Sequence, residues 1–239
     1  MKDKQEREIQ YQYYTQTAEC YDKKHLDIEH ILAVHILAAY IEFYNIKTVL
    51  DVGAGTGKTV HWLKNRFPNL VVKGIEPVKA LREQGYKKGI SHQDLIDGDA
   101  YQLAFPDNTF YLVCEFAILH HVKEPEKVIH EMSRVASKMV AISDVNFMGQ
   151  GSLVLRWLKF AIFFLGLWSL ANYFKTKGKG YTLSKGDGLA YSYSVYQSLR
   201  TLNRSWQTLR LHSTKGKSDT FFGSFISAEH LLIIAHTKT

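Results

Sequence analysis

The chain has 239 residues, of which 46% are hydrophobic and 22% are charged, and its formal net charge is +7. This length and apolar content suit a single α/β domain over residues 1–239 with a full core and some elaboration. Cys20 and Cys114 are too far apart in the sequence for a metal-ligand spacing and the histidines are scattered, so we expect no bound metal and a reduced, cytoplasmic protein.

The N-terminal segment, residues 1–45, is expected to form a helical cap. Residues 5–22 are rich in tyrosine and should form a first helix. Residues 26–44 should form a second helix, because apolar side chains recur there with the helical period. The apolar positions that share this face are Ile31, Val34, Ala38 and Ile41.

A glycine-rich loop follows the next expected element, the apolar strand at residues 48–53. Gly53, Gly55 and Gly57 alternate with other residues just after Asp51, and such glycines permit backbone turns that a Cβ would forbid. The spacing is one residue short of a phosphate-binding loop, because position 52 is valine. The third glycine also comes one residue early for a dinucleotide fingerprint, and a carboxylate beside a pyrophosphate would be repulsive. The loop is therefore of a nucleotide-binding type, but it matches neither the phosphate-binding loop nor the dinucleotide fingerprint.

Strands and helices then alternate through the chain, which predicts βαβ units and a parallel sheet. The expected helices are residues 57–66, 78–88 and 124–137, and the expected strands are 70–76, 94–98, 110–115, 138–144, 207–213 and 230–237. Such sheets bind ligands beyond the carboxyl ends of their strands. The acidic residues that fall at or near these ends are Asp51, Glu76, Asp99 and Glu115.

Four motifs in order resemble class I S-adenosylmethionine-dependent methyltransferases of the small-molecule type, similar to the ubiquinone- and menaquinone-biosynthesis group. They are Asp51-x-Gly53-x-Gly55-x-Gly57, residues 71–77, residues 96–101 and residues 103–114. The resemblance implies a Rossmann-like, seven-stranded, mostly parallel sheet with helices on both faces. It also implies an antiparallel last strand and an insertion between strands five and six. Two positions depart from the family pattern: Tyr111 stands where Asp is usual, and Glu115 is less usual at its strand end.

The same resemblance assigns a set of residues to the cofactor S-adenosyl-L-methionine. Glu76 would accept hydrogen bonds from both ribose hydroxyls, and Asp99 would meet the adenine edge. The tyrosine-rich first helix would fold over the cofactor, unless it only packs on the sheet. The full expected set is Asp51, Gly53, Ala54, Gly55, Gly57, Glu76, Pro77, Asp99, Ala100, Glu115 and Tyr14.

Residues 147–206 are expected to form the insertion and to act as a lid over the methyl acceptor. Residues 153–174 are densely apolar, and the helical period places four aromatic residues on one face: Trp157, Phe160, Phe164 and Trp168. The uncharged run 160–174 has 15 residues, fewer than the roughly 20 that cross a membrane. A core helix, a lid over an apolar pocket and an interfacial helix all stay open. A turn is expected at residues 186–188, followed by a group of tyrosines.

Positive charge is concentrated in the last third of the chain. Residues 151–239 carry 12 Lys and Arg against 3 Asp and Glu, which favours either an anionic partner or a charged surface that keeps the protein soluble. This basic segment adjoins the apolar stretch, and no RNA-binding module is evident. We therefore expect a partly apolar small-molecule acceptor and peripheral membrane contact rather than nucleic acid, and the oligomeric state stays open.

The catalytic groups are less defined than the cofactor site. Methyl transfer from a sulfonium is an in-line displacement for which the enzyme supplies positioning and desolvation, and a base is needed only when the acceptor must first lose a proton. The candidates for catalytic groups are His120, His121 and Tyr193. Three functions stay open: a small-molecule or lipid methyltransferase, an RNA methyltransferase, and a non-catalytic cofactor-binding domain.

Overall fold

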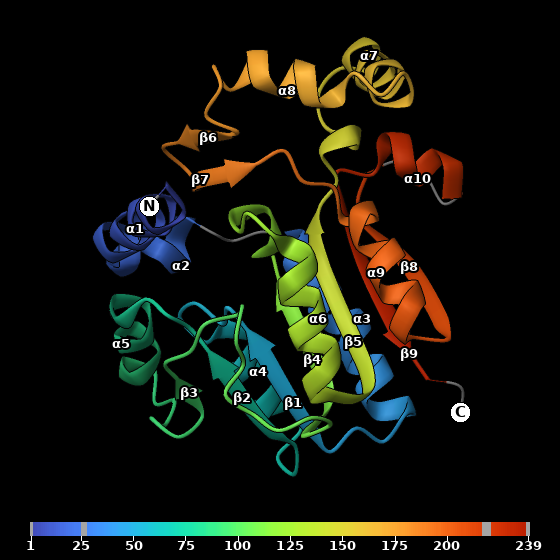
Figure 1. Cartoon of the computed structure of the whole chain (residues 1–239). Coiled ribbons are helices and arrows are strands. Elements are labelled where there is room, and N and C mark those ends of the chain that lie inside the picture. Colours follow the sequence, from blue (N-terminus) through green and yellow to red (C-terminus); the bar gives the residue numbers. More distant parts are fainter. Residues whose placement is uncertain (1, 25–27, 217–220, 238–239) are drawn as a thin grey trace.

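The computed structural model describes residues 2–24, 28–216 and 221–237 (Figure 1). Its α-helices are α1 Lys2–Thr17, α2 Tyr21–Lys24, α3 Ile28–Phe43, α4 Lys58–Arg66, α5 Lys79–Lys87, α6 Pro125–Val135, α7 Leu153–Phe164, α8 Trp168–Lys175, α9 Ser198–Ser205 and α10 Phe221–Ser227. Its strands are β1 Thr48–Val52, β2 Val71–Ile75, β3 Leu95–Ile96, β4 Phe110–Phe116, β5 Ala136–Val145, β6 Tyr181–Ser184, β7 Gly188–Tyr191, β8 Thr208–Lys215 and β9 His230–His236. Four 3₁₀ turns are η1 Ala18–Cys20, η2 Leu119–His121, η3 Phe147–Gly149 and η4 Val195–Gln197. Residues 26 and 27, where the second helix was expected to begin, lie outside the described residues.

Seven strands form one sheet in the order β3-β2-β1-β4-β5-β9-β8. Strands β1 to β5 pair in parallel, and β9 runs antiparallel to both of its neighbours, β5 and β8. The register sets Val52 beside Ile75 on one side and beside Glu115 on the other. The carboxyl ends of β1, β2 and β4 are therefore level. The expected Rossmann-like sheet with an antiparallel last strand is confirmed.

Helices cover both faces of this sheet because its central strands are apolar on both sides. In β1, Leu50 and Val52 pack into one core cluster, with side chains of α6 and α9. Val49, on the opposite face, packs into a second cluster with side chains of α3 and α4. Cys114 lies fully buried in the second cluster, as its apolar strand predicts.

The N-terminal segment contains one helix that packs on the sheet and one that lies near the strand ends. Helix α3 packs on the sheet, where Ala33, Leu37 and Ile41 are buried, whereas Ile31 of the expected apolar face is exposed. Helix α1 instead lies beside α5 and β7, away from the sheet's central strands (Figure 1). Only the first part of residues 1–45 therefore lies where a cap over the strand ends would lie.

The insertion between β5 and β8 extends beyond the carboxyl end of the sheet (Figure 1). The expectation that one helical face continues from Trp157 to Trp168 is wrong. Helix α7 ends at Phe164 and α8 starts at Trp168, with Gly166 at φ 72° between them. Trp168 therefore does not continue the face of α7. The expected turn at 186–188 joins β6 to β7, a hairpin that the sequence did not predict. Within the described part of the chain, no helix combines the length and the apolar character needed to cross a membrane.

Candidate functional site

The loop between β1 and α4 is shaped by three glycines with positive φ angles. These are 72° at Gly53, 56° at Gly55 and 72° at Gly57, a region that residues with a Cβ rarely adopt. The backbone N–H groups of Gly53 and Ala54 both donate to the Ile75 carbonyl, at 2.9 Å each. The loop is thereby held against the end of β2.

The first two glycines meet different surroundings. A Cβ at Gly53 would collide with the Ile118 side chain, so the protein's own packing already requires glycine there. A Cβ at Gly55 would lie 3.6 Å from the nearest atoms, which belong to the ring of Tyr21. A Cβ could therefore be accommodated there in ordinary contact with Tyr21, and Gly55 also lines a cavity in which a ligand could approach the backbone closely.

Glu76 follows β2 directly and holds the loop from the other side. It is buried, and its two carboxylate oxygens accept hydrogen bonds from the N–H groups of Gly55, at 3.0 Å, and Val78, at 2.8 Å. Burial raises the pKa of Glu76 to about 7, although these two N–H groups act in the opposite direction. Each oxygen keeps capacity to accept from a further donor, such as a ligand hydroxyl.

Asp51 lies on β1 beneath the loop and is also buried. Burial and, second, the nearby Glu76 carboxylate raise the pKa of Asp51 to about 8. Two carboxyl groups that disfavour each other's charge would both be relieved by a cationic ligand. The site is therefore suited to a ligand with positive charge and hydroxyl groups.

Two adjoining cavities open at the carboxyl ends of the strands. The larger, of about 550 Å³, is lined by these residues of the predicted cofactor set: Tyr14, Gly53, Gly55, Glu76, Pro77, Asp99 and Ala100. The smaller, of about 250 Å³, is lined by Asp51 and Ala54. Gly53, Tyr21 and Phe116 line both cavities, whose volumes are in the range of small-molecule and cofactor sites.

Gly57 and Glu115 of the predicted set line neither cavity. A Cβ on Gly57 would meet the packed side chains of Ile90 and Leu95. Glu115 is fully buried, and its Oε2 accepts a hydrogen bond from the N–H of Ile118, at 3.0 Å, while Oε1 has no hydrogen-bond partner within the described residues. Burial and then the Asp144 carboxylate raise the pKa of Glu115 well above its usual value. The structure therefore places both residues in the wall behind the cavities.

Helix α1 closes the outer rim of the larger cavity with a residue that sequence reasoning missed. Arg7 Nη1 donates to Asp99 Oδ2 at 2.9 Å, and the guanidinium lies 4.3 Å from the centroid of the Tyr101 ring. Both partners of this ion pair are about half exposed, so the pair itself contributes little to stability. Its position shows that α1 lies over the cavity mouth.

The segment after α1 is fastened to the glycine loop by Asp22. The Thr56 hydroxyl donates to Asp22 Oδ1 at 2.6 Å, Lys58 Nζ lies 3.5 Å from the same oxygen, and Lys88 pairs with Oδ2. Burial would raise the pKa of Asp22, but the hydrogen bonds from Lys88 and Thr56 outweigh it and lower the pKa. This connection fixes the neighbouring Tyr21 ring over Gly55.

The two histidines expected as catalytic candidates form a polar cluster with acidic residues. His120 Nδ1 lies 2.7 Å from Asp144 Oδ1, and His120 Nε2 lies 3.3 Å from Asp187 Oδ2. Burial would lower the pKa of His120, but these two carboxylates raise it to about 10. The pKa of His121 is instead lowered by burial and by the charge of His120.

Of the three catalytic candidates, only His121 reaches the larger cavity. His120 is buried behind it. Tyr193 is also buried, and its hydroxyl is hydrogen-bonded to Ser198. Asp187, which the sequence analysis missed, is the sole acidic residue of the insertion. A lone carboxylate in a Gly-Asp-Gly turn of a basic segment was the available signal.

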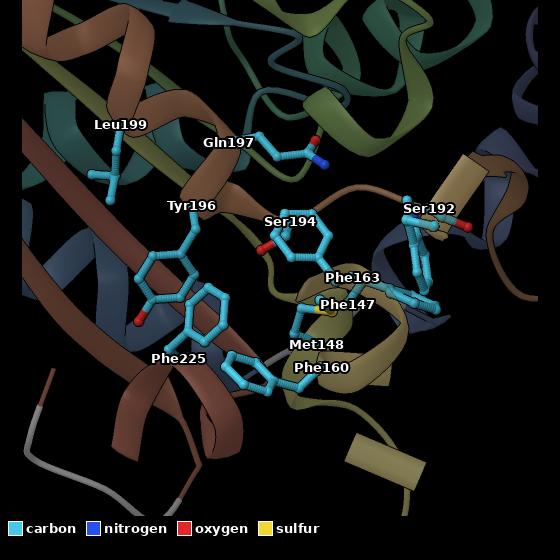
Figure 2. A pocket seen from close by; sticks show the side chains of 11 residues that line it. Phe147, Met148, Phe160, Phe163, Ser192, Ser194, Tyr196, Gln197, Leu199 and Phe225 are labelled. Carbon is cyan, nitrogen blue, oxygen red and sulfur yellow. The ribbon is translucent and has the colours of Figure 1, made fainter. Parts of the chain in front are cut away.

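A third cavity, of about 390 Å³, lies within the insertion (Figure 2). Its lining is mostly aromatic, with Phe147 from η3, Phe160 and Phe163 from α7, and Phe225 from α10. Figure 2 shows the Tyr196 and Phe225 rings side by side at one wall, with centroids 4.8 Å apart. Of the four aromatic residues expected on one face, Phe160 and Trp168 thus border a cavity, whereas Trp157 and Phe164 do not line it.

Two lysines of the insertion are already engaged beside this cavity. Lys175 Nζ donates to Ser192 Oγ at 2.9 Å and lies 4.2 Å from the centroid of the Phe147 ring. Lys159 is buried and donates to the carbonyl of Gln150 at 2.7 Å. Both amines therefore hold the insertion together.

Comparisons with known proteins agree with this geometry. The profile of a family described as a methyltransferase domain matches residues 50–140. The chain is 35% identical over 96 residues to norajmaline N-methyltransferase of Rauvolfia serpentina. This aligned segment covers 38% of this chain and 32% of that protein. The chain is also 36% identical over 103 residues to phosphatidylethanolamine N-methyltransferase of Cereibacter sphaeroides, and this alignment covers 41% of this chain and 49% of that protein.

A solved structure extends the likeness of the fold to nearly the whole chain. Magnesium protoporphyrin IX methyltransferase from Synechocystis, with bound SAH, superposes with a TM-score of 0.65 at 14% identity, over 97% of this chain and 100% of that one. The chain spans about a third to a half of the length of the two curated relatives above. The sequence likeness is therefore confined to one segment, whereas the fold is shared throughout.

Proposed function

We propose that the whole chain transfers the methyl group of S-adenosylmethionine to a partly apolar small molecule or lipid, on the premise that residues 50–140 match the profile of a methyltransferase domain. The observation that carries the proposal is the cleft at the level strand ends. There a buried carboxylate, Glu76, accepts from the N–H of Gly55 in the glycine loop, and both residues line the larger cavity.

The chemistry of this cleft matches the cofactor group by group. Glu76 offers both oxygens to the ribose hydroxyls, and Asp51 lies in the adjoining cavity where a cationic methionine portion would be favoured. The rim formed by Asp99 and Ala100 would border the adenine. The larger cavity has a volume of about 550 Å³, enough for the adenosine portion of such a ligand.

The residues around the reacting centre position the groups and exclude water. Methyl transfer needs an in-line approach of the acceptor to the sulfonium carbon in a dry site. Tyr14 and His121 line the larger cavity, and the Tyr14 hydroxyl lies 3.0 Å from His121 Nε2. Burial, helped by neighbouring acidic groups, raises the pKa of Tyr14 well above its usual value, so the tyrosine stays neutral. Together with α1, these side chains would shield the methyl group from solvent.

Binding and transfer are expected to occur in the same purified protein. Calorimetry should show binding of S-adenosylhomocysteine and no binding of NAD or ATP. Radiolabelled methyl groups from S-adenosylmethionine should then appear in an organic extract when amphipathic amines, phenols or phospholipids are supplied. Binding without transfer to any acceptor would favour a non-catalytic domain. Transfer to RNA alone would refute the apolar acceptor, and heat with NAD or ATP but with neither S-adenosyl ligand would refute the cofactor.

The exposed side of α7 and α8 supports a lipid surface as the place where the acceptor is found. Large apolar side chains are uncovered along both helices, among them Val154 at 80%, Phe164 at 81% and Phe174 at 70% exposure. Soluble proteins rarely expose such a continuous apolar surface without a partner. The exposed lysines Lys177 and Lys179, just after α8, suit anionic head groups. We call this the α7–α8 surface.

Replacing Phe164 and Phe174 together by serine should abolish sedimentation with vesicles that contain phosphatidylglycerol. Both side chains are already exposed to water, so the fold should be unaffected while the apolar contact area with the lipid is lost. Phe43→Ser is the matched control, because Phe43 is 80% exposed at the end of α3, just before the start of β1 and outside the α7–α8 surface. Equal vesicle binding by the double variant and the control would contradict membrane contact at this surface.

A further inference from the structure

Three ligand-type side chains converge at the wall of the larger cavity, and the function proposed above does not use them as a group. One donor atom from each of His120, His121 and Asp187 lies within 4.8 Å of the other two. The Nε2 atoms of His120 and His121 lie 3.3 Å from Asp187 Oδ2 and Oδ1, respectively. The histidines belong to η2 and the carboxylate to the turn between β6 and β7. Only the folded insertion brings them together.

The other nitrogen of each histidine ring is already occupied by an acceptor. His120 Nδ1 donates to Asp144 Oδ1 at 2.7 Å, and His121 Nδ1 donates to the Leu189 carbonyl at 2.6 Å. The Gln10 amide nitrogen lies farther from His121 Nδ1, at 3.1 Å. Because carboxylate and carbonyl oxygens accept, each Nδ1 carries a hydrogen. The Nε2 atom of His120 faces Asp187, and that of His121 faces both Asp187 and the Tyr14 hydroxyl. Metal-binding histidines in proteins are held in this way.

The separations are close to those around a small transition-metal ion. Zinc with bonds of about 2.0–2.1 Å to nitrogen and oxygen needs tetrahedral ligand atoms about 3.3–3.4 Å apart. Each histidine nitrogen lies 3.3 Å from a different oxygen of Asp187. One atom from each residue gives a set within 4.8 Å, so the side chains would close in on the ion. Two imidazoles and one carboxylate form the usual ligand set of zinc sites that keep a fourth position open.

The charges balance for a divalent ion. With both imidazoles neutral, the negative charges that face the ion are those of Asp187 and, behind His120, Asp144. A divalent cation bound there would neutralise both. The Tyr14 hydroxyl lies 3.0 Å from His121 Nε2 on the side of the larger cavity. The Tyr14 hydroxyl marks the side from which a fourth ligand would approach the ion.

We propose that His120, His121 and Asp187 bind one Zn²⁺ ion that fastens the β6–β7 turn to η2, with its fourth position directed toward the cavity. The ion would tie the insertion to the core at the point where α1 also contacts β7. An oxygen or nitrogen atom of the acceptor would be suited to the open position.

Metal content and zinc titration test this site without relying on turnover. The untagged, chelator-treated protein should bind one equivalent of Zn²⁺ by calorimetry and gain thermal stability when zinc is added. Asp187→Asn and His121→Ala should each weaken zinc binding at least 100-fold. His61→Ala, on the exposed side of α4, is the matched control and should bind zinc like the parent. Co²⁺ should give the intense visible bands of a tetrahedral site in the parent and the control only.

Two results would overturn the proposal. The first is a parent protein that binds no stoichiometric zinc and whose melting temperature zinc does not change, which would leave the cluster as an ion-pair network. The second is tight zinc binding retained in Asp187→Asn, which would place the ion elsewhere. If a variant fails to fold, reversible loss of parent stability with a chelator, restored by Zn²⁺, decides the question. S-adenosylhomocysteine binding is measured separately, so failure of the zinc site and failure of the methyltransferase proposal are distinguishable.

Discussion

Replacing Glu76 by glutamine should weaken binding of S-adenosylhomocysteine by about 1.5–3 kcal/mol, roughly 10- to 150-fold in the dissociation constant. The amide removes the charge that strengthens two hydrogen bonds to the ribose. It also turns an NH₂ group toward one of the two backbone N–H groups, of Gly55 or Val78, that the carboxylate now accepts from. Calorimetry at pH 8, where the Glu76 carboxylate is ionised, measures the full effect.

The same substitution should change how stability depends on pH. The pKa of Glu76 is about 7 in the folded protein against an ordinary 4.5, so folding favours the protonated form. Its stabilising contribution is therefore complete below about pH 4.5 and is lost as the pH rises through 7. Between these limits the free energy of unfolding of the ligand-free parent should fall by about 3 kcal/mol relative to Glu76→Gln. Cofactor affinity of the parent should change in the opposite sense and weaken as the pH falls below about 7.

Glu83→Gln is the matched control for these measurements. Glu83 lies on α5 and is exposed, so its substitution removes one charge nearby without touching the cavity. The control should keep both the affinity and the pH profile of the parent. Parent-like affinity in Glu76→Gln would show that another residue accepts from the ribose, and a parent-like pH profile would assign the titration to Asp51.

Gly55→Ala should leave a folded protein that no longer binds the cofactor. The added methyl group would make only ordinary contact with Tyr21 beside the larger cavity, so only the positive φ of 56° is strained, at a cost of about 1–2 kcal/mol. That cavity is where the cofactor would approach the backbone. Gly53→Ala should instead destabilise the protein itself, by about 1–3 kcal/mol beyond this strain, because its Cβ collides with Ile118.

Gly89→Ala provides the matched control for backbone strain. Gly89 has φ 89° and no atom within 4 Å of an added Cβ, so its variant carries the strain without the cavity contact and should bind like the parent. Adding Ile118→Ala to Gly53→Ala should recover part of the lost stability. Thermal unfolding and calorimetry on all four proteins separate the two effects. Cofactor binding by Gly55→Ala at parent affinity would remove the glycine loop from the site.

Local sequence was sufficient for the sheet and for the placement of Asp51 and Glu76 at one cleft. Strands such as β1 and β5 are apolar on both faces, and the helices between them show the helical period, so βαβ units follow. Parallel strands bring their carboxyl ends to one edge, which is why Asp51 and Glu76 could be placed together from their positions alone. The fold expected for residues 48–145 and the antiparallel β9 are confirmed.

The structure of the insertion could not be predicted from local sequence. Its apolar residues predict a helix, but neither hydropathy nor period says where the chain breaks, and Gly166 separates α7 from α8. Nor could the pattern show that Phe160 lines a cavity while Phe164 is 81% exposed. Burial is decided by which elements pack against each other, and local sequence does not encode that choice.

The sequence by itself determined the resemblance to a methyltransferase domain over residues 50–140, the sheet, and the placement of Asp51 and Glu76 at its edge. Each depends on residues near one another in the chain or on the level ends of parallel strands. Only the tertiary structure decided the surroundings of those groups. Arg7 reaches Asp99 across 92 positions, and Asp187 reaches His120 across 67. Such contacts depend on how α1 and the β6–β7 hairpin dock on the strand ends. Long-range docking leaves no periodic trace in the sequence.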